Sequence, residues 1–229
     1  MTALPPVEPF VDRSVVPNVV GFLHRPATPL HDALVLTHGA GSNSRTPLLV
    51  ELAETFAKAG ILVLRCDLPF RQSSPQGPPK PGNAERDREG LRNAVDTVRK
   101  LVPGRIFLGG HSYGGRQSSL LSASSLGLAD GLLLLSYPLH PPRKPQQQRV
   151  QHFPQLQTPA LFVHGTRDPF GSEEELSEAV KLVPARTEIF FVTGVGHDLK
   201  PAKAQQVSGY QWLAEKVQQR LENFFGRAS

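Results

Sequence analysis

The sequence predicts an α/β fold in which helices cover both faces of a mostly parallel central sheet. Two observations support this prediction. Short apolar runs recur along the chain without polar alternation, as expected of strands that are buried on both faces. Longer stretches between most of these runs carry apolar residues at three- and four-residue spacing, which is typical of amphipathic helices. Alternation of the two patterns favours parallel strands that are connected by helices.

The apolar runs define the predicted strands in chain order. They cover residues 33–38, 61–66, 105–110, 132–136, 160–164 and 188–192. No run approaches the roughly 20 residues that a membrane-spanning helix requires. We therefore expect these runs to form the buried sheet of a protein that does not enter a membrane.

Helices are expected between most of the strands and at the end of the chain. The predicted helical stretches are residues 47–60, 83–104, 114–124, 172–184 and 202–225. Gly60 is a plausible C-cap of the first stretch, because glycine readily adopts the left-handed conformation that ends a helix. Ser172 is the expected N-cap of the fourth stretch, and acidic residues follow it in the first turn.

Two proline-rich segments, residues 68–83 and 137–159, interrupt this rhythm. Each follows a predicted strand at its carboxyl end, where open α/β sheets bind their ligands. They are either ordinary surface loops or the walls of an active-site mouth. On the second interpretation, Tyr137 and His140 are candidate substrate-binding residues, although an ordinary loop position remains the alternative for His140.

Size and composition indicate one globular domain over residues 1–229. Hydrophobic residues make up 39% of the chain and charged residues 20%, which excludes a disordered protein. The net charge of +5 is modest, and the densest charged stretch, residues 84–100, mixes both signs, so no nucleic-acid partner is expected. The start of the chain lacks a secretory-signal pattern, and the single Cys66 excludes an internal disulfide. These features predict a cytoplasmic protein.

The stretch LGGHSYGGRQ contains the candidate nucleophile, Ser112. Gly110 and Gly114 flank this serine in the pattern G-x-S-x-G, which suits a chain that turns sharply from a strand into a helix. A predicted strand precedes the motif and a predicted helix follows it, as a nucleophile elbow requires. The alternative is a tight connection without catalytic chemistry.

A serine nucleophile needs a general base, and that base needs an orienting carboxylate. Asp168 lies four residues beyond the strand that ends at residue 164, and His197 lies in a glycine-rich loop after the next strand. Either residue alone would be interpreted as an ordinary turn or helix-entry position. Together, in this order and at strand ends, they predict a triad of Ser112, Asp168 and His197.

Acyl transfer also needs hydrogen-bond donors for a developing oxyanion. The glycine-rich turn in THGAGSN follows the first predicted strand, and Tyr113 directly follows the candidate nucleophile. We expect the main-chain N–H groups of Ala40 and Tyr113 to be these donors. The alternative for the first of them is a plain strand-to-helix turn.

Four motifs, THGAGSN, GGHSYGG, HGTRDPFG and GVGHD, together resemble those of the α/β-hydrolase superfamily and span most of the chain. The pattern is similar to that of the small, capless, dienelactone-hydrolase-like group, whose relatives include testis-expressed hydrolase-like proteins and a chromatin-complex regulatory subunit. The resemblance implies an α/β-hydrolase fold without a separate cap domain. True dienelactone hydrolases have a cysteine where this chain has Ser112, so their substrate is not carried over.

No cofactor or metal is expected, because the sequence contains neither a cysteine pair nor H-E-x-x-H, and no G-x-G-x-x-G opens a helix after a first strand. His38 and His164 each close a strand before a glycine and are expected to form structural hydrogen bonds. The side chain of His111, beside the nucleophile, is expected to point away from the pocket.

The sequence thus favours a serine hydrolase, similar to carboxylic ester hydrolases, that acts on a small-molecule ester, thioester or amide through an acyl-enzyme. The alternative is a non-catalytic interaction module, because some members of the resembled group are known as interaction subunits. An intact triad favours the enzyme.

Overall fold

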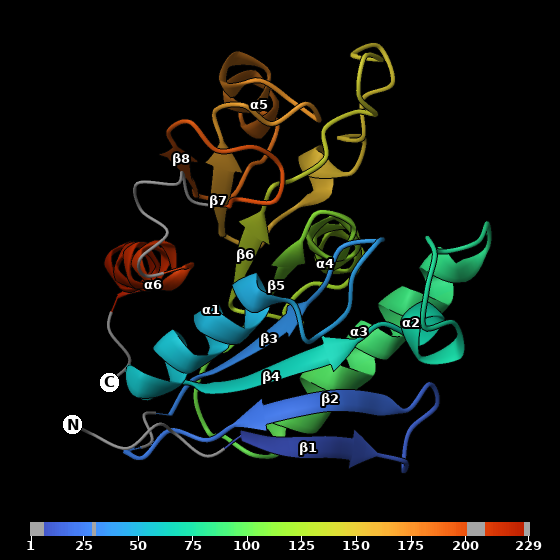
Figure 1. Cartoon of the computed structure of the whole chain (residues 1–229), viewed down its shortest axis with the longest axis vertical. Coiled ribbons are helices and arrows are strands. Elements are labelled where there is room, and N and C mark those ends of the chain that lie inside the picture. Colours follow the sequence, from blue (N-terminus) through green and yellow to red (C-terminus); the bar gives the residue numbers. More distant parts are fainter. Residues whose placement is uncertain (1–6, 29–30, 201–208, 227–229) are drawn as a thin grey trace.

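The computed structural model describes residues 7–28, 31–200 and 209–226, and its centre is a single twisted sheet (Figure 1). Eight strands of the described residues follow the order β1-β2-β4-β3-β5-β6-β7-β8. These strands are β1 Val7–Asp12, β2 Val19–His24, β3 Ala33–Thr37, β4 Leu62–Asp67, β5 Ile106–His111, β6 Gly131–Leu135, β7 Ala160–Gly165 and β8 Thr187–Val192. Strands β3 to β8 are parallel, whereas β2 pairs antiparallel with both β1 and β4.

Helices cover both faces of this sheet. They are α1 Pro47–Lys58, α2 Pro69–Ser73, α3 Asn83–Arg99, α4 Tyr113–Ala123, the 3-10 helix η1 Phe153–Gln155, α5 Glu173–Val180 and α6 Gln211–Phe225. The buried residues of α1 and α6 pack on one face, and those of α3, α4 and α5 pack on the other (Figure 1). The expected mostly parallel sheet with helices on both faces is confirmed.

The uninterrupted apolar runs follow from this layering. In β3, Ala33 and Val35 contact the core on the side of α3, whereas Leu34 and Leu36 contact the core on the side of α1. All four side chains are fully buried. Because successive side chains of a strand point to opposite faces, a sheet covered on both faces needs apolar residues at every position.

The predicted helix ends are confirmed at two places. Gly60 follows α1 with a φ of 89°, and the N–H of Ile61 returns to the carbonyl of Phe56 at 3.0 Å, so the glycine closes the helix. At the start of α5, Ser172 accepts a hydrogen bond from the N–H of Glu175, whose carboxylate accepts one from the N–H of Ser172. This reciprocal pair is a capping box.

Several elements differ from the sequence-based expectation. Strands β1 and β2 and the short helix α2 were not predicted, and the helices predicted at 83–104 and 172–184 end earlier, at Arg99 and Val180. Of the helix predicted at 202–225, α6 accounts for the part from Gln211, and residues 202–208 lie outside the described residues. Between β6 and β7, where every residue is described, the only regular element is η1, so no separate cap domain is inserted there.

None of the helices in the described ranges is both long enough and apolar enough to cross a lipid bilayer.

Candidate active site

The serine turn connects β5 to α4 at the centre of the sheet. Ser112 has a φ of 53° and a ψ of −114°, a backbone conformation that non-glycine residues rarely adopt. A Cβ atom on Gly110 would lie 2.7 Å from the carbonyl oxygen of Thr37, and one on Gly114 would lie 2.6 Å from that of His38. Only glycine fits at these two positions, so the motif allows a tight turn that presents the serine at the carboxyl end of the strand.

The structure brings Ser112, Asp168 and His197 together. Nε2 of His197 lies 2.8 Å from the hydroxyl oxygen of Ser112, and Nδ1 lies 2.8 Å and 3.0 Å from the two carboxylate oxygens of Asp168. With Nδ1 protonated, the imidazole donates to the carboxylate and Nε2 accepts the hydroxyl proton. The carboxylate is fully buried, and it also accepts a hydrogen bond from the N–H of Phe170 at 2.9 Å.

Two further side chains hold His197, and the sequence analysis assigned a role to neither. The ring of Phe170 stacks on the imidazole, with centroids 4.1 Å apart and planes inclined by 30°. His111 does not line the cavity beside the serine, in agreement with the expectation, and its Nε2 donates to the carbonyl oxygen of His197 at 2.7 Å. Burial lowers the pKa of His111 to about 4, so this ring stays neutral near pH 7. Both residues lie inside the motifs GGHSYGG and HGTRDPFG. A motif, however, does not show which of its side chains contact the candidate base.

The turn at residues 38–41, expected to supply an oxyanion donor, lies directly against the nucleophile. A Cβ atom on Gly39 would lie 3.5 Å from the Cβ of Ser112. His38 accepts a hydrogen bond from the N–H of Leu68 at Nε2 and donates from Nδ1 to the carbonyl of Gly39 at 2.9 Å. Ala40 and Tyr113 both line the cavity beside the serine, and Tyr113 is the first residue of α4.

Arg71 of α2 binds the same turn and is only 6% exposed. Its guanidinium donates to the carbonyls of Ala40 and Ser42 at 2.9 Å and 2.7 Å, and to those of Ser74 and Gly77 at 2.9 Å and 2.8 Å. The side chain therefore connects the candidate oxyanion turn with the first proline-rich segment. The sequence analysis missed this residue, because one arginine in a proline-rich stretch carries no recognisable motif.

A cavity of about 390 Å³ opens beside the nucleophile. Its lining combines residues of the elbow, of the glycine-rich turn and of both proline-rich segments: Ala40, Pro78, Pro79, Ser112, Tyr113, Arg116, Pro138, Arg149 and Phe170. The proline-rich segments thus line the mouth of the site and are not remote surface loops.

The two candidate substrate-binding residues do not line this cavity, which corrects their assignment. Tyr137 is fully buried, packs against Phe153 with ring centroids 5.2 Å apart, and donates its hydroxyl to the carbonyl of Arg149 at 2.8 Å. His140 is 5% exposed and pairs with Glu175 at 3.2 Å. The apolar core buries the ring of Tyr137, whereas Glu175 and a main-chain carbonyl hold that of His140. The neighbouring Pro138 lines the cavity instead.

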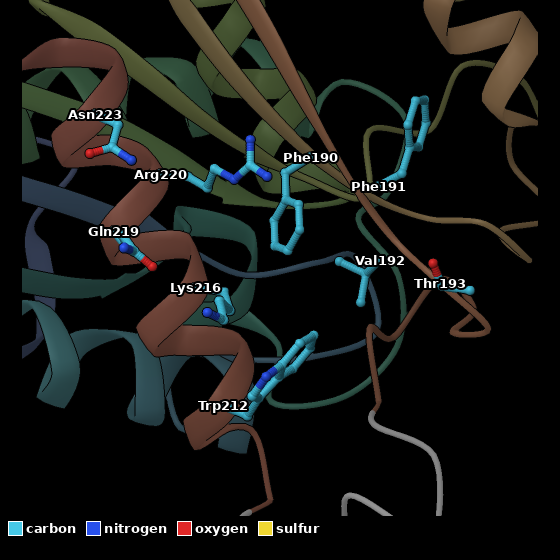
Figure 2. A pocket seen from close by; sticks show the side chains of 9 residues that line it. All are labelled: Phe190, Phe191, Val192, Thr193, Trp212, Lys216, Gln219, Arg220 and Asn223. Carbon is cyan, nitrogen blue, oxygen red and sulfur yellow. The ribbon is translucent and has the colours of Figure 1, made fainter.

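A second, larger cavity of about 610 Å³ lies between β8 and α6 (Figure 2). Figure 2 shows Phe190 and Trp212 pointing into this space and Phe191 on the other side of the strand. Arg220 at its border lies over the ring of Phe190 and donates to the carboxylate of Glu188 at 3.0 Å. This cavity shares no lining residue with the one beside the serine, so the chemistry of the side chains, and not the volume, identifies the candidate active site.

Within the described part of the chain, no group of three or more histidine, cysteine, aspartate or glutamate side chains is arranged to bind a metal ion.

A family model described as "Alpha/beta hydrolase domain" matches residues 31–225. Solved structures that resemble the chain include a dienelactone hydrolase from Anabaena variabilis (15% identity, 97% of this chain and 99% of that chain covered, TM-score 0.74). An α/β serine hydrolase homologue from Coxiella burnetii shares 17% identity, with 93% and 97% coverage and a TM-score of 0.72. The protein XC6422 from Xanthomonas campestris, described as a serine hydrolase without a lid, shares 14% identity, with 96% and 98% coverage and a TM-score of 0.70.

Proposed function

The chain belongs to the α/β-hydrolase family, and from this premise we propose that it is a serine hydrolase that cleaves a small ester, thioester or amide through an acyl-enzyme. The observation that carries the proposal is the continuous hydrogen-bonded relay from the hydroxyl of Ser112 through His197 to the buried carboxylate of Asp168. A relay of this kind supplies both the base and the orientation that a serine nucleophile needs.

The proposed reaction begins when the hydroxyl oxygen of Ser112 attacks the acyl carbonyl carbon. Nε2 of His197 takes the hydroxyl proton, and the carboxylate of Asp168 stabilises the imidazolium that forms. The carbonyl π electrons move to the carbonyl oxygen, where the N–H groups of Ala40 and Tyr113 are the proposed donors to the oxyanion. When the tetrahedral intermediate collapses, the bond to the leaving group breaks, and the imidazolium protonates that group.

Water completes the cycle. His197 takes a proton from a water molecule, whose oxygen attacks the acyl-enzyme carbonyl, and the second tetrahedral intermediate releases a carboxylic acid and restores the hydroxyl of Ser112. The cavity of about 390 Å³ suits a small acyl substrate, and both proline-rich segments contribute to its walls.

A fluorophosphonate probe tests the nucleophile directly. We expect one covalent adduct on the parent protein, measured by intact-mass spectrometry, and no adduct on Ser112→Ala, because that variant lacks the attacking oxygen. A panel of esters with different acyl-chain lengths then identifies the preferred acyl group. A folded parent protein that forms no adduct and hydrolyses no ester would overturn the proposal in favour of a non-catalytic interaction module.

A further inference from the structure

Two arginines lie in the wall of the cavity beside the nucleophile, from different parts of the chain. Arg116 is one helical turn beyond Ser112 in α4, and its N–H donates to the serine carbonyl at 2.9 Å. Arg149 comes from the second proline-rich segment, between β6 and η1. The lining of the cavity contains no carboxylate, so nothing in the wall itself neutralises the two charges.

Neither guanidinium forms an ion pair in the ranges that the structure describes, and the hydrogen bond indicated for Arg116 is to the neutral hydroxyl of Tyr137. The Nε atom of Arg116 is shielded from solvent and lacks a partner. Two buried arginines elsewhere in the described ranges do have polar partners: Nε of Arg65 donates to His24 at 2.8 Å, and the guanidinium of Arg71 donates to four main-chain carbonyls. A shielded cationic donor without a partner, such as Nε of Arg116, is unusual, because desolvation costs free energy that no contact returns.

The surroundings of these two arginines also remain uncharged or positive. Burial, and then the charge of Arg116, lower the pKa of the Arg149 guanidinium, so each cation disfavours the other. Burial and the charge of Arg116 also lower the pKa of the nearby His152 to about 4, which leaves that imidazole neutral at pH 7. An anion that enters the cavity would therefore meet two cations and no competing carboxylate in its lining.

Main-chain contacts fix the positions from which both side chains reach the cavity. The hydroxyl of Tyr137 donates to the carbonyl of Arg149 at 2.8 Å, and the N–H of Arg149 donates to the carbonyl of Leu139 at 2.7 Å. The hydroxyl of Ser119 donates to the carbonyl of Arg116 at 3.0 Å. Tyr137, which does not line the cavity, thus acts as a support for a residue that does.

We propose that Arg116 and Arg149 bind an anionic group, a carboxylate or a phosphate, on the substrate whose acyl carbonyl is attacked by Ser112. This inference rests on the proposed function and specifies the substrate class. Guanidinium groups form strong, directional hydrogen bonds with both kinds of oxyanion. Because one cavity holds the nucleophile and both arginines, the anionic group and the reacting carbonyl belong to the same small molecule.

Matched esters test the proposal. The 4-nitrophenyl monoester of glutaric acid carries a free carboxylate, and 4-nitrophenyl pentanoate is a neutral ester of similar length. We expect the parent protein to hydrolyse the anionic ester with a kcat/KM at least about ten times higher. Arg116→Gln and Arg149→Gln should each lower that preference about 10- to 100-fold, the value of a charged hydrogen bond. Arg220→Gln, in the cavity between β8 and α6, is the matched control and should keep the parent preference.

Competition separates the two oxyanions without requiring turnover. Glutarate and inorganic phosphate are each added while a neutral fluorophosphonate labels Ser112, and the labelling rate is followed by intact-mass spectrometry. The anion that slows the labelling of Ser112 more strongly is the preferred group. This protection of Ser112 by the anion should disappear in Arg149→Gln. Arg116→Lys and Arg149→Lys retain the charge and serve where a glutamine variant fails to fold.

The results distinguish the two proposals. A parent protein that is labelled at Ser112 but hydrolyses both esters equally, and that neither anion protects, would overturn the anion site and leave the serine hydrolase intact. Equal losses on both esters in the arginine variants would also overturn it, because the arginines would then act on the fold or on general catalysis. No labelling and no turnover would overturn the proposed function itself.

Discussion

The cavity beside Ser112 and the cavity between β8 and α6 differ in what surrounds them more than in how large they are. The cavity between β8 and α6 is the larger, about 610 Å³ against about 390 Å³. Each has two cationic side chains in its wall. In the larger cavity Arg220 binds Glu188 and packs over an aromatic ring, whereas Arg116 and Arg149 in the smaller cavity form no ion pair within the described ranges. A cation that is already paired with a carboxylate, as Arg220 is, offers less to an anionic ligand than an arginine without an ion pair.

Their positions in the sheet explain this difference. The smaller cavity lies at the carboxyl ends of the parallel strands, where β5 and the loops after β7 and β8 bring Ser112, Asp168 and His197 together. The larger one lies along the side of β8, where side chains of a strand and a helix meet. Main-chain turns that expose donors and reactive side chains occur at strand ends, not along strand sides.

The largest effect that separates the two cavities concerns turnover. Ser112→Ala and His197→Ala should each lower kcat by about 10⁴-fold or more, and the double variant should lose little more, because the two residues act as one unit. Lys216→Ala, in the larger cavity, is the control and should keep the parent rate. The measurement is hydrolysis of the best ester of the panel. Single losses that multiplied in the double variant would contradict a shared mechanism.

A smaller loss is expected from the carboxylate. Asp168→Asn keeps the shape of the side chain but no longer stabilises the imidazolium, so kcat should fall by about 10⁴-fold, less than the loss for either partner. Circular dichroism should show an unchanged fold. A variant with parent activity would indicate that His197 is held by Phe170 and His111 alone and needs no carboxylate.

Arg71 and Arg220 provide a matched comparison of two arginines, one buried beside the candidate active site and one exposed. Arg71→Met removes the donor to the carbonyls of the candidate oxyanion turn, so we expect kcat to fall about 10- to 100-fold, less than the roughly 10²- to 10³-fold loss for removing an oxyanion donor itself, with little change in KM. Stability should fall by about 2–4 kcal/mol, because buried carbonyls lose their partner. Arg71→Lys should recover part of kcat. A less stable Arg71→Met with parent kcat would show a purely structural role.

The pH dependence of stability tests whether His111, at the carboxyl end of β5, is neutral in the folded protein. Its pKa is lowered from 6.5 to about 4, so between these values the unfolded chain binds a proton that the folded protein does not. The free energy of unfolding therefore falls as the pH falls through this window, by about 2 kcal/mol after allowance for partial exposure. His111→Gln retains a donor and does not titrate. Urea unfolding at pH 7 and pH 4.5 should show a smaller loss in this variant, and equal losses would contradict the assignment.

The smallest effect is expected at Arg220. Its side chain is 49% exposed in its pair with Glu188, and exposed ion pairs contribute little because water and salt screen them. Arg220→Ala should change the free energy of unfolding by less than about 1 kcal/mol and leave kcat unchanged. Urea unfolding and the ester assay measure both quantities. A large loss of activity would make the larger cavity part of the catalytic machinery.

The strands that are buried on both faces could be predicted from the sequence. The candidate catalytic side chains could be predicted as well, because they belong to recognisable motifs. The run at 160–164 became β7, and the order of serine, aspartate and histidine led to three side chains that the fold brings into contact. Strand β1 escaped prediction because it lies at the sheet edge, contains Pro9 and is largely exposed, so it lacks the apolar run of an inner strand.

The contacts that shape the cavity were not predictable in the same way. Arg71, Arg116 and Arg149 lie far apart in the sequence or on the polar side of a helix, and only the packing of loops on the sheet brings their side chains to the site. Tyr137 was assigned to the cavity from its place after β6, but a strand end leads equally well into the core, and the large ring is buried there. A pattern of residue types does not specify which side of a loop faces the site.

The hydrogen bonds of Arg71 also set a condition for changing the specificity of the proposed hydrolase. Pro78 and Pro79 belong to a segment outside the sheet, so loop exchange there is an obvious route to new specificity by directed evolution. That segment is not independent of the catalytic centre, because Arg71 binds its carbonyls at Ser74 and Gly77 together with those of the glycine-rich turn. Libraries that keep the backbone at residues 74–77 and vary residues 78–82 should therefore retain active members, whereas wholesale replacement of the loop would disturb catalysis and specificity at once.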